Sequence, residues 1–199
     1  MHALFFSFLW GCALTLGPSS TENSAIEEEM GDVGFDFENV DLGVQANNDC
    51  VQYLGYQSCD IILKDQNDEY FRLYDHKGKV ILLDFSTGWC GPCKQAAATV
   101  EETQVLYEED DFLYITVLIE DDEGQATTLG YAQEWANSYR IETAPVLQGS
   151  RDLIDYNGVE GYNLTGWPTF YVIDRDMKLD SGIRGYDEEW IHQHIQDVL

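Results

Sequence analysis

Basic residues are scarce in this sequence. Ten Lys and Arg stand against 37 Asp and Glu among 199 residues, which gives a formal net charge of −27 at pH 7. A surface that binds nucleic acid needs clustered Lys and Arg, so the composition excludes nucleic acid as a partner, and an acidic surface repels anionic membranes. The acidity predicts a solvated anionic shell, with a docking face for a basic partner as the alternative.

The apolar run at positions 3–16 is too short for a comfortable membrane span, which needs about 20 residues. It has the length of the apolar core of a signal peptide, although no Lys or Arg precedes it. Within it, Leu9-Trp10-Gly11-Cys12 resembles a bacterial lipobox despite the bulky Trp10. We therefore expect residues 1–17 to be an export signal, and a lipoprotein leader that anchors the chain to a membrane if Cys12 is lipidated. A buried N-terminal helix is the alternative.

Residues 18–49 also lack Lys and Arg, but they are rich in Asp and Glu. Low hydrophobicity combined with charge of one sign cannot bury enough apolar surface to offset chain entropy. This composition predicts an acidic disordered linker that holds the folded domain away from a membrane. Local docking of Phe35 and Phe37 is the alternative.

The chain has an odd number of cysteines, so one of the five is left over from pairing: Cys12, Cys50, Cys59, Cys90 and Cys93. In an exported protein, the pair separated by eight residues, Cys50 and Cys59, is expected to form a structural disulfide. A redox relay between this pair and Cys90/Cys93 is an alternative. A zinc site built from the four is another, which the wide spacing disfavours. We expect no metal and no cofactor.

Residues 50–199 alternate between strand-like and helix-like patterns, starting with a hairpin. Strands are expected at 60–65, 70–74, 80–85, 112–119, 144–147, 170–174 and 178–184, and helices at 94–109, 128–139 and after Asp187. The order predicts one α/β domain with a central mixed β-sheet flanked by helices and an extra N-terminal β-hairpin.

The sequence Cys90-Gly91-Pro92-Cys93 stands between the apolar segment 80–85 and the predicted helix. A helix N-terminus carries partial positive charge and unpaired N–H groups, so it stabilises a thiolate and lowers the thiol pKa. A second cysteine one turn further is close enough to form a disulfide. The motif by itself indicates redox chemistry or metal binding.

With these residues in view, the chain resembles the thioredoxin superfamily over residues 58–199. It is most similar to the TlpA-like and AhpC/TSA-like exported thiol-disulfide oxidoreductases. Three segments carry the resemblance: Asp84-Phe85-Ser86-Thr87-Gly88-Trp89-Cys90-Gly91-Pro92-Cys93-Lys94, Gly166-Trp167-Pro168-Thr169-Phe170 and Gly78-Lys79-Val80. The resemblance implies a thioredoxin fold and a cis-proline loop at Pro168, whose backbone pairs with a substrate chain like an added strand.

The resemblance also implies the roles of the site residues. Cys90 would attack a substrate disulfide, Cys93 would resolve the mixed disulfide, and Asp84 would assist proton transfer from a buried position that is otherwise costly for a carboxylate. The lysine that pairs with this aspartate in thioredoxins is missing from 116–119, so Asp84 is expected to be less ionised. The expected substrate-binding residues are Trp89, Gly91, Pro92, Trp167, Pro168 and Thr169.

Three positions depart from the family pattern. Ser86 replaces a tryptophan, and Ala98 replaces a helix proline, so the usual helix kink is expected to be missing. Ala96 stands where cytochrome-c-maturation reductases carry an acidic residue, which argues against that specific role.

The sequence therefore predicts a monomeric thiol-disulfide oxidoreductase, periplasmic or anchored as a lipoprotein, facing the oxidising side of the membrane. Its substrates would be protein or peptide disulfides, and an unidentified electron donor would return it to the dithiol form. Gly91-Pro92 is the pairing of thioredoxin, which favours a reductase or isomerase over an oxidant. A thiol peroxidase is one alternative, because Thr87 lies three residues before Cys90, although no proline or arginine of that site is placed near. A non-enzymatic binding module on the same scaffold is the other.

Overall fold

The computed structural model describes residues 41–45 and 51–199. Residues 1–40 and 46–50, and with them the expected signal segment, Cys12, most of the expected linker and Cys50, lie outside the described residues. Lipidation of Cys12 and the Cys50–Cys59 disulfide therefore stay predictions.

The described strands form two sheets. A three-stranded antiparallel sheet has the order β1-β2-β3, and a five-stranded mixed sheet has the order β6-β5-β4-β7-β8. The strands are β1 Gly43–Gln45, β2 Asp60–Lys64, β3 Tyr70–Arg72, β4 Val80–Thr87, β5 Phe112–Glu120, β6 Val146–Gln148, β7 Thr169–Ile173 and β8 Leu179–Arg184. The predicted mixed sheet and its N-terminal hairpin are confirmed.

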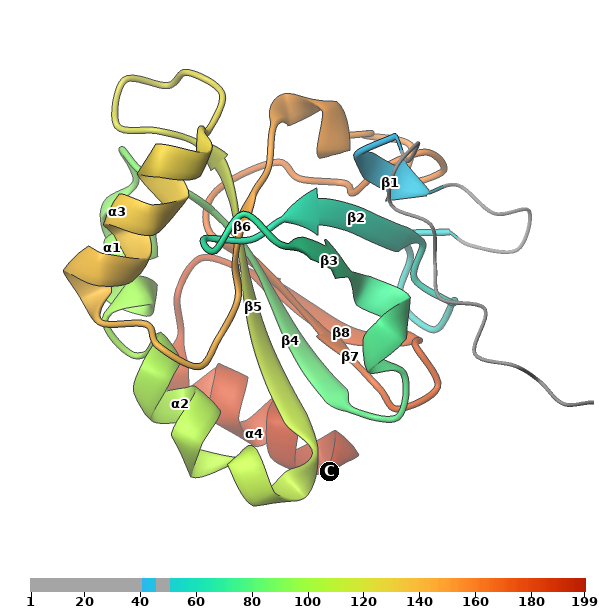
Figure 1. Ribbon diagram of the computed structural model, residues 1–199. Helices are drawn as coiled ribbons and strands as arrows, with labels where there is room; N and C mark the ends of the chain where they lie inside the picture. The colour runs from blue at the N-terminus through green and yellow to red at the C-terminus, as the bar shows by residue number, and fades with distance from the viewer. Residues whose placement is uncertain (1–40, 46–50) are drawn as a thin grey trace, which may run out of the picture. The chain divides into compact units, whose positions relative to one another are not determined.

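The helices cover one side of the five-stranded sheet, and the three-stranded sheet lies on the other side (Figure 1). They are α1 Gly91–Ala97, α2 Val100–Leu106, α3 Leu129–Tyr139 and α4 Glu188–Val198, with short 3-10 turns η2 Leu73–His76, η3 Glu108–Asp110 and η4 Arg151–Leu153. The parallel strands β4, β5 and β6 lie in sequence order. Right-handed crossovers between strands added in one direction place their helices on one face, so α1, α2 and α3 share a side.

β4 is buried on both faces along its whole length, and its first four residues, Val80 to Leu83, are accordingly all apolar. Successive side chains of a strand point to opposite faces. Val80 and Leu82 accordingly pack in the cluster on the helical side, whereas Ile81 and Leu83 pack in the cluster under the three-stranded sheet. Asp84 continues the first set, so its carboxyl group faces the helical layer.

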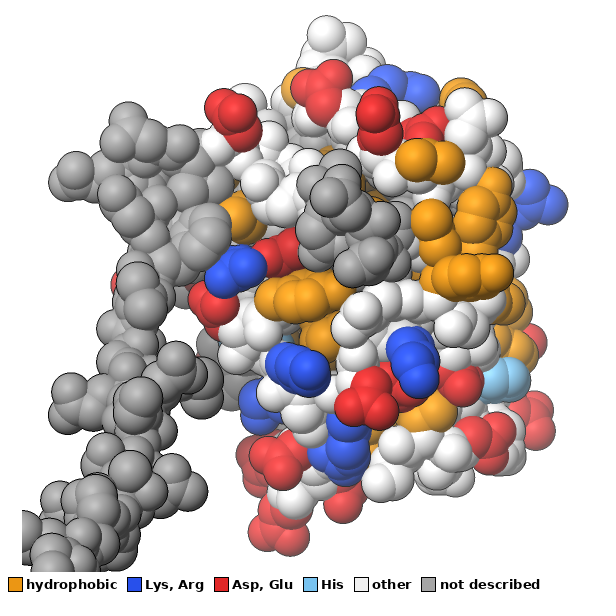
Figure 2. Space-filling view, turned by 90° about the vertical axis from the view of Figure 1, so that its right-hand side faces the viewer, with side chains coloured by type: hydrophobic (Ala, Val, Ile, Leu, Met, Phe, Trp, Pro, Cys, Tyr) orange, Lys and Arg blue, Asp and Glu red, His pale blue; other side chains and the backbone are white. Residues whose placement is uncertain are grey.

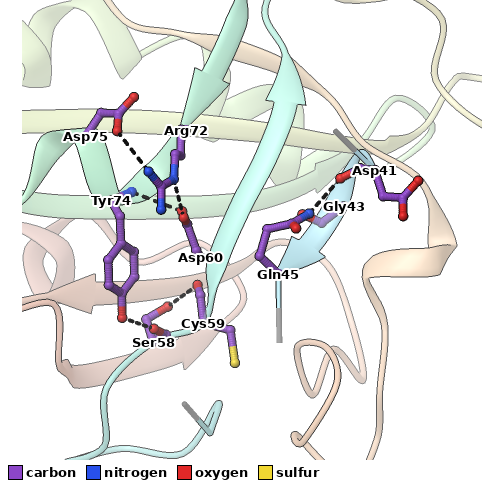
Figure 3. Close-up of polar contacts among 9 residues, drawn as sticks. All are labelled: Asp41, Gly43, Gln45, Ser58, Cys59, Asp60, Arg72, Tyr74 and Asp75. Atoms are coloured by element: carbon purple, nitrogen blue, oxygen red, sulfur yellow. Dashed lines mark hydrogen bonds and ion pairs between the residues drawn. The ribbon is translucent and has the colours of Figure 1, made fainter. Parts of the chain in front are cut away.

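The hairpin β2–β3 is held by a buried carboxylate (Figure 3). The Asp60 side chain, 4% exposed, accepts from Arg72 Nε at 2.5 Å and from the Tyr74 backbone N–H at 3.1 Å. The Tyr74 hydroxyl donates to the Ser58 carbonyl at 2.6 Å. These bonds fix the hairpin next to the chain segment that carries Cys59.

β1 was not expected from the sequence. Gly43–Gln45 pairs with β2 in antiparallel register, although it lies within the segment 18–49 for which disorder was predicted. The edge of β2 offers unpaired backbone groups to this segment, and Val44 packs against the cluster below the hairpin. The prediction of disorder is therefore wrong for these three residues.

The single helix expected over 94–109 is two helices, and the first begins at Gly91, which places Cys93 inside it. The break lies at Ala98 and Thr99, so the expectation that the kink is missing is wrong. Thr99 makes the break: its backbone N–H and its hydroxyl both donate to the Ala96 carbonyl at 2.9 Å, and the hydroxyl lies 3.0 Å from Tyr186 Oη. A threonine hydroxyl that competes for a helix carbonyl bends helices.

The surface mixes charges of both signs on the side shown in Figure 2, with hydrophobic side chains exposed among them. That side carries no continuous field of one sign, despite the net charge of the chain. Within residues 41–45 and 51–199, no helix has both the length and the apolar character needed to cross a membrane.

Candidate redox site

The turn between β4 and α1 depends on a glycine. Gly88 is buried, its N–H donates to the Glu120 carbonyl at 2.8 Å, and a Cβ at this position would lie 2.7 Å from the backbone of Asp121 and contact the Tyr131 hydroxyl. Only glycine allows this close approach. The turn is thereby held against the carboxyl end of β5, and it delivers Cys90 to the N-terminus of α1.

Cys90 and Cys93 form a disulfide, with their Cα atoms 5.2 Å apart. Cys90 is the N-cap of α1, and its sulfur accepts from the Cys93 backbone N–H at 3.3 Å. Cys90 is 5% exposed and Cys93 is fully buried, while Gly91 and Pro92 between them are exposed. Cys90 is therefore the sulfur that an incoming substrate can reach.

Asp84 lies on the face of β4 that meets the helical layer, and the cluster on that side also contains Cys93. It is 1% exposed, and Ser86 Oγ donates to its Oδ1 at 2.7 Å. Burial raises the pKa of Asp84 from its ordinary value of 3.8 to about 7, and the hydroxyl groups of Ser86 and Tyr114 oppose that rise. A carboxyl group with this pKa can take up or release a proton near neutrality.

The polar surroundings of Asp84 are only partly satisfied. Thr116 stands opposite Asp84 in the β4–β5 register, at the strand where thioredoxins carry a lysine. Asp84 Oδ2, Tyr114 Oη and Thr116 Oγ1 are buried without a hydrogen bond of regular geometry to any described residue. Burial and the nearby Asp84 carboxylate both raise the pKa of Tyr114. None of the described groups that shift the pKa of Asp84 is a cation.

The loop before β7 lies beside the motif because of the strand register. Thr169 pairs with Phe85, so the residues just before it reach the end of β4 that carries the cysteines. The Trp167–Pro168 bond is cis, as predicted. Pro168 and Thr169 are buried, and the Thr169 hydroxyl donates to the Gly166 carbonyl at 2.8 Å. The backbone N–H and C=O of Trp167 make no hydrogen bond with any described residue, which leaves them available to an added strand.

A pocket of about 490 Å³ opens between the two expected substrate-binding tryptophans, Trp89 and Trp167. Trp89 is 48% exposed, and its indole Nε1 donates to Glu120 Oε2 at 2.8 Å. The other oxygen of Glu120 accepts from Arg151 Nε, and Arg151 lines the same pocket.

Sequence reasoning missed Glu120 and Arg151. The expectation that no arginine lies near the motif is wrong, because Arg151 reaches it through Glu120. The position of Glu120 could have indicated a functional role, because a carboxylate stands at the end of a buried, mostly apolar strand. Asp84 stands out for the same reason within β4. Arg151 lies in a stretch for which no strand or helix is expected from the sequence, and it gave no such signal. Within the described residues, no group of three or more His, Cys, Asp and Glu is placed to hold a metal ion.

Comparison with known proteins finds thioredoxin-like proteins and thiol-disulfide oxidoreductases that are similar to this chain. The model of the AhpC/TSA family matches residues 54–181. The chain is 32% identical over 121 residues to the thioredoxin-like protein YneN of Bacillus subtilis. This match covers 60% of this chain and 65% of that protein. It is 23% identical over 146 residues to the thiol-disulfide oxidoreductase ResA of Geobacillus thermodenitrificans, covering 73% and 78%.

A solved structure agrees in fold. The crystal structure of the exposed lipoprotein thioredoxin of Streptococcus pneumoniae superposes with a TM-score of 0.55 at 25% identity, covering 69% of this chain and 98% of that one.

Proposed function

From the premise that this chain belongs to the AhpC/TSA family, we propose that it is a thiol-disulfide oxidoreductase that reduces or isomerises protein disulfides outside the cytoplasm. One observation carries the proposal: the reachable sulfur of Cys90, at the start of α1, lies beside a cis-proline loop whose Trp167 backbone is unpaired among the described residues. A substrate chain can bind as an added strand there and present its disulfide to Cys90.

The reaction is disulfide exchange. The Cys90 thiolate attacks one sulfur of the substrate disulfide, a disulfide forms between Cys90 and that sulfur, and the other substrate sulfur leaves as a thiolate. The Cys93 thiolate then attacks Cys90 Sγ, which re-forms the Cys90–Cys93 disulfide and releases the second substrate thiol. Two electrons pass to the substrate, and a dithiol reductant returns the pair to its reduced form. If a different thiolate of the same substrate attacks the substrate sulfur of the mixed disulfide before Cys93 attacks, a new substrate disulfide forms and Cys90 leaves as a thiolate, so the substrate is isomerised with no net transfer of electrons.

Asp84 serves the second step. The buried Cys93 thiol must lose its proton before it can attack, and Asp84 faces the same helical layer from β4. With a pKa of about 7, its carboxylate form can accept that proton near neutrality. Ser86 donates to Asp84 and favours this carboxylate form.

Action outside the cytoplasm is supported by two features. The apolar run at 3–16 has the length of a signal segment and contains the lipobox-like residues before Cys12. The similar structure from Streptococcus pneumoniae is that of an exposed lipoprotein. Under this proposal Cys50 and Cys59 form a structural disulfide. Labelling cells with a radioactive fatty acid tests the anchor: the full chain should be labelled and Cys12→Ala should not.

Insulin reduction by dithiothreitol tests the activity. The full chain should accelerate precipitation of the reduced B chain, and Cys90→Ser should be inactive. Absence of acceleration by the wild type would reject the proposal. Peroxide consumption, measured in parallel, should stay at the buffer rate; rapid turnover of peroxide would identify a peroxidase instead.

A further inference from the structure

The pocket beside Trp89, the residue before Cys90, is lined by aromatic and aliphatic side chains, by Thr165 and Gly166, and by one charged side chain. Trp89, Trp167, Ile154, Tyr156 and Leu164 line it, and among its described lining residues only Arg151 carries a charge. In a chain with ten Lys and Arg against 37 Asp and Glu, a lone cation at the substrate pocket is contrary to the composition.

Arg151 is anchored and still has free donors. Glu120 is 4% exposed, and its two oxygens accept from Arg151 Nε and from Trp89 Nε1. A buried carboxylate needs such partners. The Glu120 carboxylate therefore holds both Arg151 and Trp89, the residue that precedes Cys90. The Arg151 side chain remains 60% exposed, and its Nη groups make no hydrogen bond with any described residue. Guanidinium N–H groups in this fork arrangement match a carboxylate.

The nearest carboxylates in the sequence do not occupy those donors. Asp152 accepts from Ser150 Oγ, and Asp155 accepts backbone N–H groups of its own turn from Asn157, Val159 and Glu160. Both line a different pocket. Glu120 lies behind the guanidinium, so a ligand in the pocket meets the positive group first.

We propose that Arg151 makes this site select disulfides of acidic peptide segments, in which an Asp or Glu stands within two residues of the substrate cysteine. The inference rests on the proposed disulfide exchange and names its substrate class. The substrate carboxylate binds the Nη groups of Arg151 while its disulfide meets Cys90 Sγ; exchange then proceeds as above, with a dithiol as the reductant.

The test uses the full chain in its dithiol form and three peptide disulfides that differ only in Glu, Gln or Lys next to the cysteine. Each rate constant is divided by that of dithiothreitol on the same peptide, because the neighbouring charge alters the intrinsic reactivity of the disulfide. The wild type should reduce the Glu peptide about fivefold faster than the Gln peptide, as expected for one partly exposed ion pair. The Lys peptide should be slowest, and the preference should shrink in high salt.

The double variant Glu120→Gln/Arg151→Gln removes the cation without leaving a buried charge, and it keeps an acceptor for Trp89. Its preference should fall to about onefold. Lys79→Gln/Asp111→Asn is the matched control, because it removes another ion pair at the opposite end of β4; it should keep the preference. Equal normalised rates in the wild type, or an unchanged preference in the double variant, would overturn the selectivity while leaving disulfide exchange intact. Failure to reduce any of the peptides would reject the proposed function itself.

Discussion

A hydrogen bond of 2.8 Å from the Trp89 indole Nε1 to Glu120 Oε2 connects the residue before Cys90 to the carboxyl end of β5. The same carboxylate holds Arg151, and the backbone carbonyl of Glu120 accepts from the Gly88 N–H. One buried glutamate thus positions the turn that delivers the nucleophile, one wall of the pocket and its only described charge.

Replacing Glu120 should separate positioning from charge. Glu120→Gln keeps an oxygen acceptor for Trp89, so insulin reduction should stay within about twofold of the wild type. Glu120→Ala removes the acceptor and should slow the reaction about fivefold, the equivalent of one neutral hydrogen bond. Near-UV circular dichroism checks that both variants are folded. Equal rates for the Ala and Gln variants would show that the Trp89 bond does not matter.

Asp84 should make the oxidised protein less stable as pH rises. Its folded pKa of about 7 lies above its ordinary value of 3.8, so between these values the unfolded chain releases a proton that the folded chain retains. The free energy of unfolding from this group therefore falls with rising pH, by up to about 4 kcal/mol, and levels off above pH 7.

Asp84→Asn removes this slope. Urea unfolding of the oxidised protein at pH 4, 6 and 8 should show the variant gaining on the wild type as pH rises, because the amide never ionises. Parallel stability curves for the two proteins would contradict a buried, neutral Asp84.

Ser86→Ala should shift the pH dependence of catalysis. Ser86 donates to Asp84 Oδ1 at 2.7 Å and favours its charged form, so loss of the hydroxyl raises the pKa of Asp84 further. The acid limb of the pH–rate profile should move up by about one pH unit. Thr116→Val is the control, because the Thr116 hydroxyl makes no hydrogen bond with a described residue; its profile should stay in place. A shift in both variants, or in neither, would argue against the Ser86 contact.

Arg72→Gln should destabilise the N-terminal hairpin. Arg72 neutralises Asp60, which is 3% exposed, and its loss leaves a buried carboxylate with fewer partners, at a cost of about 2 kcal/mol. Asp75→Asn disturbs only the exposed arm of the same arginine, 3.6 Å away, and should cost less than about 0.5 kcal/mol. Urea midpoints measure both. Similar losses in the two variants would mean that Asp60 does not depend on Arg72.

The sequence predicted the parts of the site that local pattern controls. β4 can be predicted because both of its faces are buried, which makes its sequence mostly apolar. Asp84 stands out because burying a carboxylate in such a strand costs free energy. The turn with Cys90 and the loop with Pro168 each have a characteristic local sequence. The register between β4 and β7 brings the two segments together.

The remaining features depend on contacts between distant segments. The break at Thr99 needs Tyr186, and β1 forms because β2 offers an edge to Val44. Arg151 enters the site only because β5 ends at Glu120, 31 residues earlier. Nothing in the local sequence of these residues indicates such partners.

Trapping the mixed disulfide shows directly which cysteine attacks the substrate. Reduced Cys93→Ser and Cys90→Ser variants are each mixed with a peptide disulfide, quenched with acid and examined by intact mass and peptide mapping. We expect a stable adduct on Cys90 in the Cys93→Ser variant, because no Cys93 thiol is present to release it. In Cys90→Ser we expect little adduct on Cys93, because the Cys93 side chain is fully buried. Adduct formation on Cys93, or none on Cys90, would contradict Cys90 as the nucleophile.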